Sequence, residues 1–162
     1  MDKFVISIIM GSQSDLETVK EAIEVIKEFK IGFEAKVLSA HRTPRELVKY
    51  VEEAPKRGTK VFIAAAGGAA ALAGVIASHT TLPVIGIPVE TKSLKGLDSL
   101  LSTVQMPQGV PVACMAIGKS GAKNAAIFAL EILGMSNKSI ESELKSYKKK
   151  MRIKIKKIKI KV

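Results

Sequence analysis

The feature that most restricts the fold of this 162-residue chain is a repeated alternation of short apolar runs with segments of helical periodicity. The apolar runs have the length of strands, and most of them are apolar throughout. Strands of this kind are buried on both faces, as they are in parallel sheets that helices cover. Five runs qualify: residues 3–10, 33–38, 60–66, 82–89 and 110–117.

Helical segments separate these runs. Apolar residues recur at helical spacing over residues 16–26, and Ser14 with Glu17 three positions later is typical of a helix start. Thr43 and Pro44 fit an N-cap followed by the first helical residue. The expected helices cover 16–29, 44–53, an alanine-rich segment after Gly68 that ends near His79, 97–101, 122–133 before Gly134, and a last segment capped by Ser139.

Strand–helix–strand units of this length connect parallel strands through right-handed crossovers. The sequence therefore predicts an α/β fold: a three-layer αβα sandwich with a flavodoxin-like parallel sheet of about five strands and a C-terminal helix. The length fits a single domain over residues 1–162. Ligands bind such sheets outside the carboxyl ends of the strands, so a functional site is expected in the loops that follow them.

Composition excludes several classes of protein. Hydrophobic residues make up 47% of the chain, yet no stretch reaches the roughly 18 apolar residues that a membrane span needs. The start, Met1-Asp2-Lys3, is unlike a secretory signal, and one cysteine, Cys114, excludes an internal disulfide framework. Two histidines and one cysteine offer no cluster of metal ligands. We therefore expect a cytoplasmic protein without a metal.

The net charge of +11 belongs to the C-terminal tail. Residues 145–162 hold ten Lys or Arg and no Asp or Glu, which leaves sixteen basic and fifteen acidic residues elsewhere. A groove that binds nucleic acid needs basic residues on the folded body, so we expect no nucleic-acid partner and no membrane partner. The apolar residues of the tail alternate with basic ones as far as Val162, which fits an edge strand. They also fit a continuation of the last helix, and we favour the helix.

The loop after the first strand, residues 11–15 (GSQSD), combines a glycine, two hydroxyls and a helix start. Free N–H groups and the helix dipole attract anions at such a position. Ser12 and Ser14 are therefore candidate phosphate ligands, and Asp15 is a candidate acceptor for sugar hydroxyls. A simple N-capping cluster explains the same residues equally well.

The loop after the second strand, residues 39–44 (SAHRTP), brings a histidine and an arginine to a helix start. His41 can move a proton near neutral pH, and Arg42 can bind a phosphate through two parallel hydrogen bonds. The alternative is a surface histidine beside a solvated arginine. The position of His41 just past a strand favours a function, and we place it at the centre of the candidate site.

The loop after the third strand, residues 66–74 (AGGAAALAG), is nearly free of side chains. A ligand can approach such a backbone closely, and its N–H groups can line a pocket. Tight packing of a helix against a strand is the alternative. The run lacks the spacing of a dinucleotide-binding fingerprint and the lysine of a P-loop.

Taken together, the three loops resemble those of the class I PurE family, the N5-carboxyaminoimidazole ribonucleotide mutases of purine biosynthesis. The motifs GSxSD, SAHRTP and AGGAA occur in the order and at the spacing of that family. Residues 81–86, 96–100 and 104–107 add further matches. The resemblance covers roughly residues 3–134.

The resemblance implies a flavodoxin-like homo-octamer and a reaction that uses no cofactor and no metal. The carboxylate of an N5-carbamate would move to carbon 4 of the imidazole by decarboxylation, trapping of CO2 and recarboxylation. His41 would be the proton shuttle, the phosphate ligands would include Arg42, and Asp15 would bind ribose. The implied substrate-binding set is Gly11, Ser12, Ser14, Asp15, Ser39, Ala40, Arg42, Ala66, Gly67, Gly68, Ala69 and Leu72, with Ser12 and Ser39 also on the phosphate and Gly67, Gly68 and Ala69 confining CO2.

The third loop departs from the family pattern, which has a histidine and a proline where this chain has Ala71 and Ala73. This difference implies a lost contact, with reduced turnover or affinity, and a less rigid loop. Two alternatives to the mutase remain, and the second of them rests on Ala71. One is an aminoimidazole ribonucleotide carboxylase that uses free CO2, a related family with a different third loop. The other is a degenerate relative that binds a nucleotide without chemistry.

Overall fold

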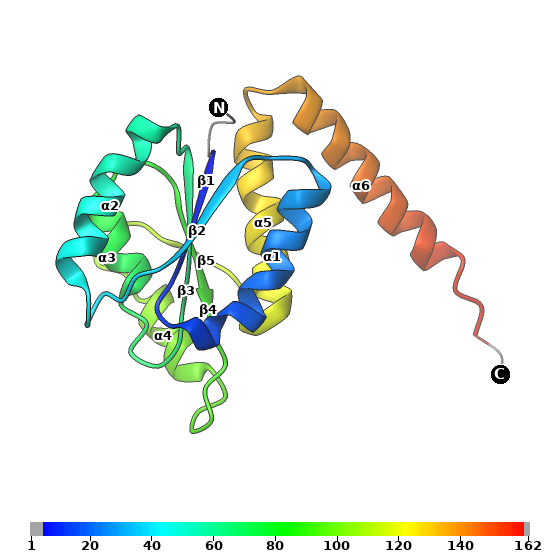
Figure 1. Ribbon diagram of the computed structural model, residues 1–162. Coiled ribbons are helices and arrows are strands. Elements are labelled where there is room, and N and C mark those ends of the chain that lie inside the picture. Colours follow the sequence, from blue (N-terminus) through cyan, green and yellow to red (C-terminus); the bar gives the residue numbers. More distant parts are fainter. Residues whose placement is uncertain (1–4, 161–162) are drawn as a thin grey trace. The chain divides into compact units, whose positions relative to one another are not determined.

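A computed structural model describes residues 5–160, and within them a parallel sheet of five strands runs in the order β2-β1-β3-β4-β5 (Figure 1). This is the doubly wound order of flavodoxin-like folds, in which the strand order reverses beside β1. The predicted fold class is therefore confirmed. The strands are β1 (Ile6–Met10), β2 (Phe33–Val37), β3 (Val61–Ala66), β4 (Val84–Pro88) and β5 (Ala113–Cys114).

Helices cover both faces of the sheet. Helix α1 lies on one face together with the first part of α5, and ion pairs from Lys119 to Glu17 and from Lys123 to Glu21 join the two helices. Helices α2, α3 and α4 lie on the other face (Figure 1). No helix among residues 5–160 is long and apolar enough to cross a membrane. The helices are α1 (Leu16–Glu28) after a 3₁₀ turn (Gln13–Asp15), α2 (Pro44–Arg57), α3 (Leu72–Ser78), α4 (Leu97–Val104), α5 (Gly118–Gly134) and α6 (Lys138–Lys156).

The core explains why β1, β3 and β4 are buried on both faces, whereas the edge strand β2 is largely exposed. The side chains of Ile6, Ile8 and Ile63 are fully buried in the two central strands. Burying a side chain of this size stabilises the fold by about 1.5–3 kcal/mol. Between the sheet and helices α2 and α3, one cluster of buried residues comprises Ile9, Leu47, Tyr50, Val51, Ala54, Phe62, Ala64, Leu72, Ala73, Ile76 and Val84.

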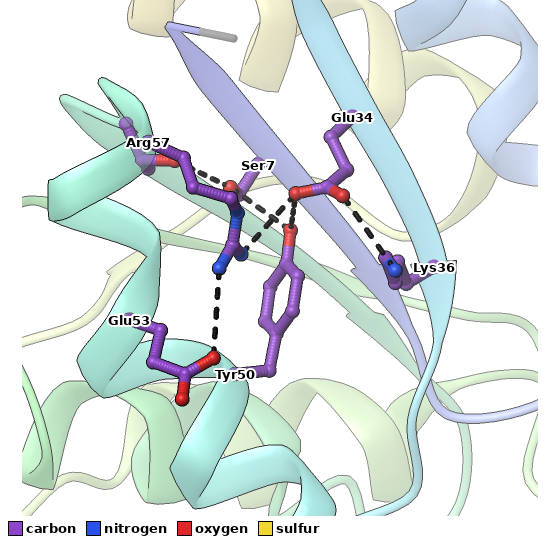
Figure 2. A network of polar contacts seen from close by, with 7 residues as sticks. Ser7, Glu34, Lys36, Tyr50, Glu53 and Arg57 are labelled. Atoms are coloured by element: carbon purple, nitrogen blue, oxygen red, sulfur yellow. Dashed lines mark hydrogen bonds and ion pairs between the residues drawn. The ribbon is translucent and has the colours of Figure 1, made fainter.

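A polar network ties the edge strand β2 to α2 and β1 (Figure 2). The hydroxyl of Tyr50 donates to Oε1 of Glu34 at 2.7 Å and lies 3.1 Å from Oγ of Ser7. Arg57 donates to the same carboxylate oxygen and its guanidinium stacks over the Tyr50 ring. Burial raises the pKa of Glu34, but the hydrogen bond from Tyr50 and the charges of Arg57 and Lys36 outweigh it, so that pKa lies below its usual range.

Some element ends differ from the expectation. Helix α2 continues through Pro55 to Arg57, because Gly58 ends it in the left-handed conformation with φ of 109°. Proline removes only one helical N–H there. The fifth strand is reduced to Ala113–Cys114, since Gly109 turns the chain at φ of 94° and Pro111 has no N–H to donate. Lys3 and Phe4 of the expected first strand lie outside the described residues.

The chain groups into two compact units, within residues 1–129 and 130–162. The second unit holds the end of α5 and the whole of α6. Asn137, rather than Ser139, caps α6, because its side chain accepts from the N–H groups of Ser139 and Ile140. The helical interpretation of the tail is confirmed as far as Lys156. Val162 lies outside the described residues, and the single domain over 1–162 stays a prediction.

Candidate active site

The loops that follow β1, β2 and β3 meet at one edge of the sheet around a cavity of about 520 Å³. His41 lies on its wall, as do ten of the twelve substrate-binding residues expected from the sequence. Gly68 and Ala69 are the two that do not line it. The wall comprises Gly11, Ser12, Ser14, Asp15, Ser39, Ala40, His41, Arg42, Ala66, Gly67, Ala70, Ala71, Leu72, Val89, Glu90 and Thr91.

The first loop is shaped by Ser12 and Asp15. The N–H of Ser12 donates to Oδ2 of Asp15 at 2.9 Å, and Oγ of Ser12 accepts from the N–H of Ser14. This reciprocal pair is a capping box for the 3₁₀ turn, so the capping box expected from Ser14 and Glu17 is wrong. The spacing of a hydroxyl and an acid three positions apart fits both pairs, and the turn that precedes α1 selects the earlier one.

Asp15 is the buried acid of the site, with only 6% of its surface exposed. Loss of solvent raises the pKa of its carboxyl, and the N–H groups of Ser12 and Gly11 offset part of that rise. Arg42 lowers the same pKa through its charge. These contacts hold the carboxylate in a fixed direction on the cavity wall, where it can accept hydrogen bonds from a ligand.

The second loop is closed by a side chain that was expected to cap a helix. Oγ1 of Thr43 accepts from the N–H of Ser39 at 2.8 Å and donates to the carbonyl of Ser39 at 3.1 Å. Thr43 stands at the N-cap position of α2, but its hydroxyl makes no cap hydrogen bond. It folds the loop back on itself instead, which exposes His41 at the turn.

Arg42 connects the second loop with the first. Its Nη2 donates to the carbonyl of Gly11 at 2.8 Å, and its Nε donates to Oγ of Ser39 at 3.3 Å. The guanidinium therefore joins the two loops, and Ser12 and Ser39 line the same cavity with their loops. A guanidinium and hydroxyl groups gathered in this way suit a phosphate, which accepts several hydrogen bonds at once.

The third loop approaches the cavity through its backbone. It leaves β3 at Ala66, turns at Gly68 with φ of 71°, and enters α3 with Ala71 at the N-cap position. A positive φ of this size favours glycine. The N–H of Val89, at the end of β4, donates to the carbonyl of Ala66 at 2.9 Å. This bond holds the start of the loop against the neighbouring strand.

The sequence interpretation missed the fourth loop. Val89, Glu90 and Thr91 follow β4 and line the cavity, and Ala70 and Ala71 line it from the third loop. The signal was their place directly after a strand that is buried on both faces, since the carboxyl ends of parallel strands share one edge. Glu90 adds a second acid to the wall. Among the described residues, no group of three or more His, Cys, Asp or Glu could hold a metal ion.

Comparison with known proteins agrees with the three loops. A model of the family described as AIR carboxylase matches residues 5–154. N5-carboxyaminoimidazole ribonucleotide mutase of Saccharolobus solfataricus is 55% identical over 147 residues, which cover 91% of this chain and 92% of that protein. The enzyme of the same name from Bacillus subtilis is 54% identical over 139 residues, with 86% of each chain covered.

Solved structures agree as well. The crystal structure of Treponema denticola PurE matches with a TM-score of 0.84 and 29% sequence identity, and covers 93% of each chain. The resemblance inferred from the loops is therefore confirmed at the level of the family. Because the match spans nearly the whole chain and includes every loop of the cavity, this protein belongs to the AIR carboxylase family, which includes PurE.

Proposed function

We propose that this protein is an N5-carboxyaminoimidazole ribonucleotide mutase of de novo purine biosynthesis. The observation that carries the proposal is the common cavity that His41, Arg42 and Asp15 line together with the glycine loop. Curated relatives of this name that are more than half identical support the same activity. The product would be 4-carboxy-5-aminoimidazole ribonucleotide.

The nucleotide would bind through its phosphate and its ribose. The hydroxyls of Ser12 and Ser39 and the guanidinium of Arg42 would hold the phosphate. The carboxylate of Asp15, fixed by the N–H of Ser12, would accept from the ribose hydroxyls. This arrangement would place the imidazole toward His41 and the third loop, where the chemistry takes place.

His41 would move a proton from one atom of the substrate to another. In the first step the bond between N5 and its carboxylate breaks, the electron pair stays on nitrogen, and the imidazolium of His41 gives nitrogen a proton. CO2 and the aminoimidazole are then present together. In the second step the electron pair of carbon 4 attacks CO2, and neutral His41 removes the proton from carbon 4. His41 thus recovers in the second step the proton that it gave in the first, and the enzyme returns to its starting state.

The third loop would keep CO2 beside the ring between the two steps. The small residues of this loop leave room for a molecule of that size next to the backbone. Recapture then takes place inside the cavity rather than from solution, which gives the ring a high effective concentration of CO2. Free CO2 would not be needed as a co-substrate.

The test is turnover of the N5-carbamate by pure protein, with and without added bicarbonate. The mutase predicts product in the absence of bicarbonate and a rate that bicarbonate does not change. A rate proportional to bicarbonate with aminoimidazole ribonucleotide as substrate would identify the carboxylase instead. Tight binding of the nucleotide with no turnover of either substrate would identify a binding protein.

We further propose that the protein is a cytoplasmic homo-octamer. Helix α4 supports assembly, because Leu97, Leu101 and Val104 lie at helical spacing and each is at least 50% exposed. Such an apolar stripe is typical of a subunit contact. A single species of octamer mass in native mass spectrometry is expected. A monomer at micromolar concentration, unchanged by Leu101→Glu, would contradict the assembly.

A further inference from the structure

Helix α4 contains a serine hydroxyl that joins two of the loops around the cavity, the one after β3 and the one after β4. Oγ of Ser99 accepts from the N–H of Gly68 at 2.9 Å and donates to the carbonyl of Val89 at 2.7 Å. Gly68 belongs to the loop after β3, and Val89 begins the loop after β4. One hydroxyl therefore connects both loops, and both of its hydrogen-bonding directions are in use.

Ser99 is buried and packed within α4. The Ser99 side chain is fully buried, and its carbonyl accepts from the hydroxyl of Thr103 one turn later. Helix α4 packs so closely on β4 that a side chain at Gly86 would collide with Thr103. The Ser99 hydroxyl is thus shielded from solvent within the packed helix, whereas its two partners, Gly68 and Val89, are partly buried. An N–H and a carbonyl that lose a buried partner are strongly destabilised, which makes the link selective for one loop conformation.

The same helix holds the fourth loop through a neighbouring residue. Oγ1 of Thr91 donates to Oδ1 of Asp98 at 2.9 Å, and Thr91 lines the cavity. On the exposed side of α4, the hydroxyl of Ser102 reaches the carbonyl of Gly68 at 3.4 Å, which is a long hydrogen bond. Of the two hydrogen bonds to Gly68, the one with Ser99 is shorter and less exposed, so it is the stronger restraint on this residue.

We propose that Ser99 is a positioning residue of this enzyme: it holds the Gly67–Gly68 turn against the end of β4 and so keeps the cavity closed around CO2. The proposal rests on the mutase activity proposed above. Ser99 does not line the cavity, so it acts through Gly68 and not on the substrate. Its importance is greater in this chain, where Ala73 in the first turn of α3 replaces a proline of the family pattern, so the preceding turn lacks that restraint.

The first experiment measures the loop without any activity. Amide hydrogen exchange is followed at Gly68 in wild type, Ser99→Ala and the matched control Ser102→Ala. We expect exchange at Gly68 to accelerate about tenfold in Ser99→Ala, since its acceptor is lost, and to stay within about twofold of wild type in Ser102→Ala. Unchanged exchange at Gly68 in Ser99→Ala would overturn the proposal, whatever reaction the protein catalyses.

The second experiment measures the escape of CO2. The N5-carbamate carries ¹³C in its carboxylate, the buffer holds unlabelled bicarbonate, and the label in the product is read by mass spectrometry. Wild type and Ser102→Ala should retain the label, whereas Ser99→Ala should lose several-fold more of it, because CO2 exchanges with the buffer before recapture. A merely less stable enzyme would turn over more slowly with full retention, and that result would overturn the role in confinement.

A hydroxyl-specific control separates loss of the bond from a change of packing. Ser99→Thr and Ser99→Val place the same extra bulk at position 99, and only threonine keeps the hydroxyl. Label retention is expected to be higher in Ser99→Thr than in Ser99→Val by several-fold. Equal label retention in Ser99→Thr and Ser99→Val would mean that side-chain volume, and not the hydrogen bond, determines the position of the loop. If wild type turns over no substrate, the proposed mutase activity is wrong. Hydrogen exchange still tests, independently of activity, whether Ser99 restrains Gly68.

Discussion

The guanidinium of Arg42 donates to the carbonyl of Gly11 at 2.8 Å, across 31 positions of sequence. This hydrogen bond joins the loop after β2 to the loop after β1, and Nε of the same guanidinium donates to the hydroxyl of Ser39. Arg42 also lines the cavity, so the same side chain can hold the loops together and make the phosphate contact that we propose.

Replacing Arg42 should therefore weaken binding more than catalysis. We expect Arg42→Ala to raise KM at least tenfold, because a charge-assisted hydrogen bond contributes about 1.5–3 kcal/mol. Arg42→Lys keeps the positive charge but not the paired N–H donors of the guanidinium. Its KM should therefore lie between that of wild type and that of Arg42→Ala. Steady-state kinetics of the three proteins provides the measurement. A KM for Arg42→Ala within about twofold of wild type would contradict a phosphate contact, since that loss is smaller than one neutral hydrogen bond.

Asp15 should show a conflict between stability and binding. Its folded pKa is raised by burial, so the folded state keeps its proton to higher pH than the unfolded state does, and stability falls as pH rises through that window. The cost is fully present once the folded carboxyl is ionised. Asp15→Asn keeps an acceptor for the N–H of Ser12 and removes the buried charge. We expect an equal or higher melting temperature at pH 7 with at least tenfold weaker binding of the nucleotide, on the scale of one lost charged hydrogen bond.

The control for Asp15 is the pH dependence of the melting temperature itself. Between pH 4 and pH 7 the difference between Asp15→Asn and wild type should grow in favour of the variant, because only wild type acquires the buried charge. Differential scanning fluorimetry at several pH values measures it. A variant that becomes relatively less stable as pH rises would show that the carboxylate stabilises the loop.

The parallel sheet and three of its four site loops were predictable, because strands that are apolar throughout and crossovers of fixed hand leave few arrangements. The fourth loop was not found, since Val89, Glu90 and Thr91 carry no motif. Ser99 was equally hidden. A serine within a helix is usually exposed, and only the packing of α4 on β4 reveals that its hydroxyl is buried and shared by two loops.

Local helix signals were ambiguous for a different reason. Ser14 with Glu17 and Ser12 with Asp15 have the same spacing, and the choice between them depends on the path of the chain out of β1. The helix expected over residues 44–53 continues through Pro55, and the left-handed Gly58 after Arg57 marks its end. In both places tertiary packing decides between two local patterns that the sequence supports equally.

The proton role of His41 predicts a selective loss of chemistry. His41→Asn should lower kcat by about 10²–10⁴-fold, because no other imidazole lines the described cavity. His41 is exposed, so its replacement should leave the melting temperature and the proposed octamer unchanged. His79→Asn is the matched control, since His79 ends α3 and pairs with Glu52 away from the cavity wall. A kcat for His41→Asn near that of wild type would refute the shuttle.

The network of Tyr50 predicts a loss of stability in alkali. Burial, together with Glu34, raises the pKa of Tyr50 from 10.0 to about 12. The neutral hydroxyl stabilises the folded state fully below pH 10, and this contribution is lost as pH rises toward 12. Tyr50→Phe should be about 1–3 kcal/mol less stable at pH 7, and the gap should narrow above pH 10. Urea unfolding at pH 7, 9 and 11 tests this. If the difference in unfolding free energy between wild type and Tyr50→Phe were the same at all three pH values, the pKa of this hydroxyl would not differ between the folded and unfolded states.

The alanine at position 71 offers a gain-of-function test of the site. Ala71 lines the cavity and stands at the N-cap position of α3, where a larger side chain can point into the open space. The family pattern has a histidine here, and Ala71→His should restore a donor to the substrate. We expect kcat/KM to rise several-fold, on the scale of one added hydrogen bond of about 1 kcal/mol. Ala71→Phe fills the same space without a donor and should lower activity. An equal effect of both substitutions would mean that position 71 acts only through volume.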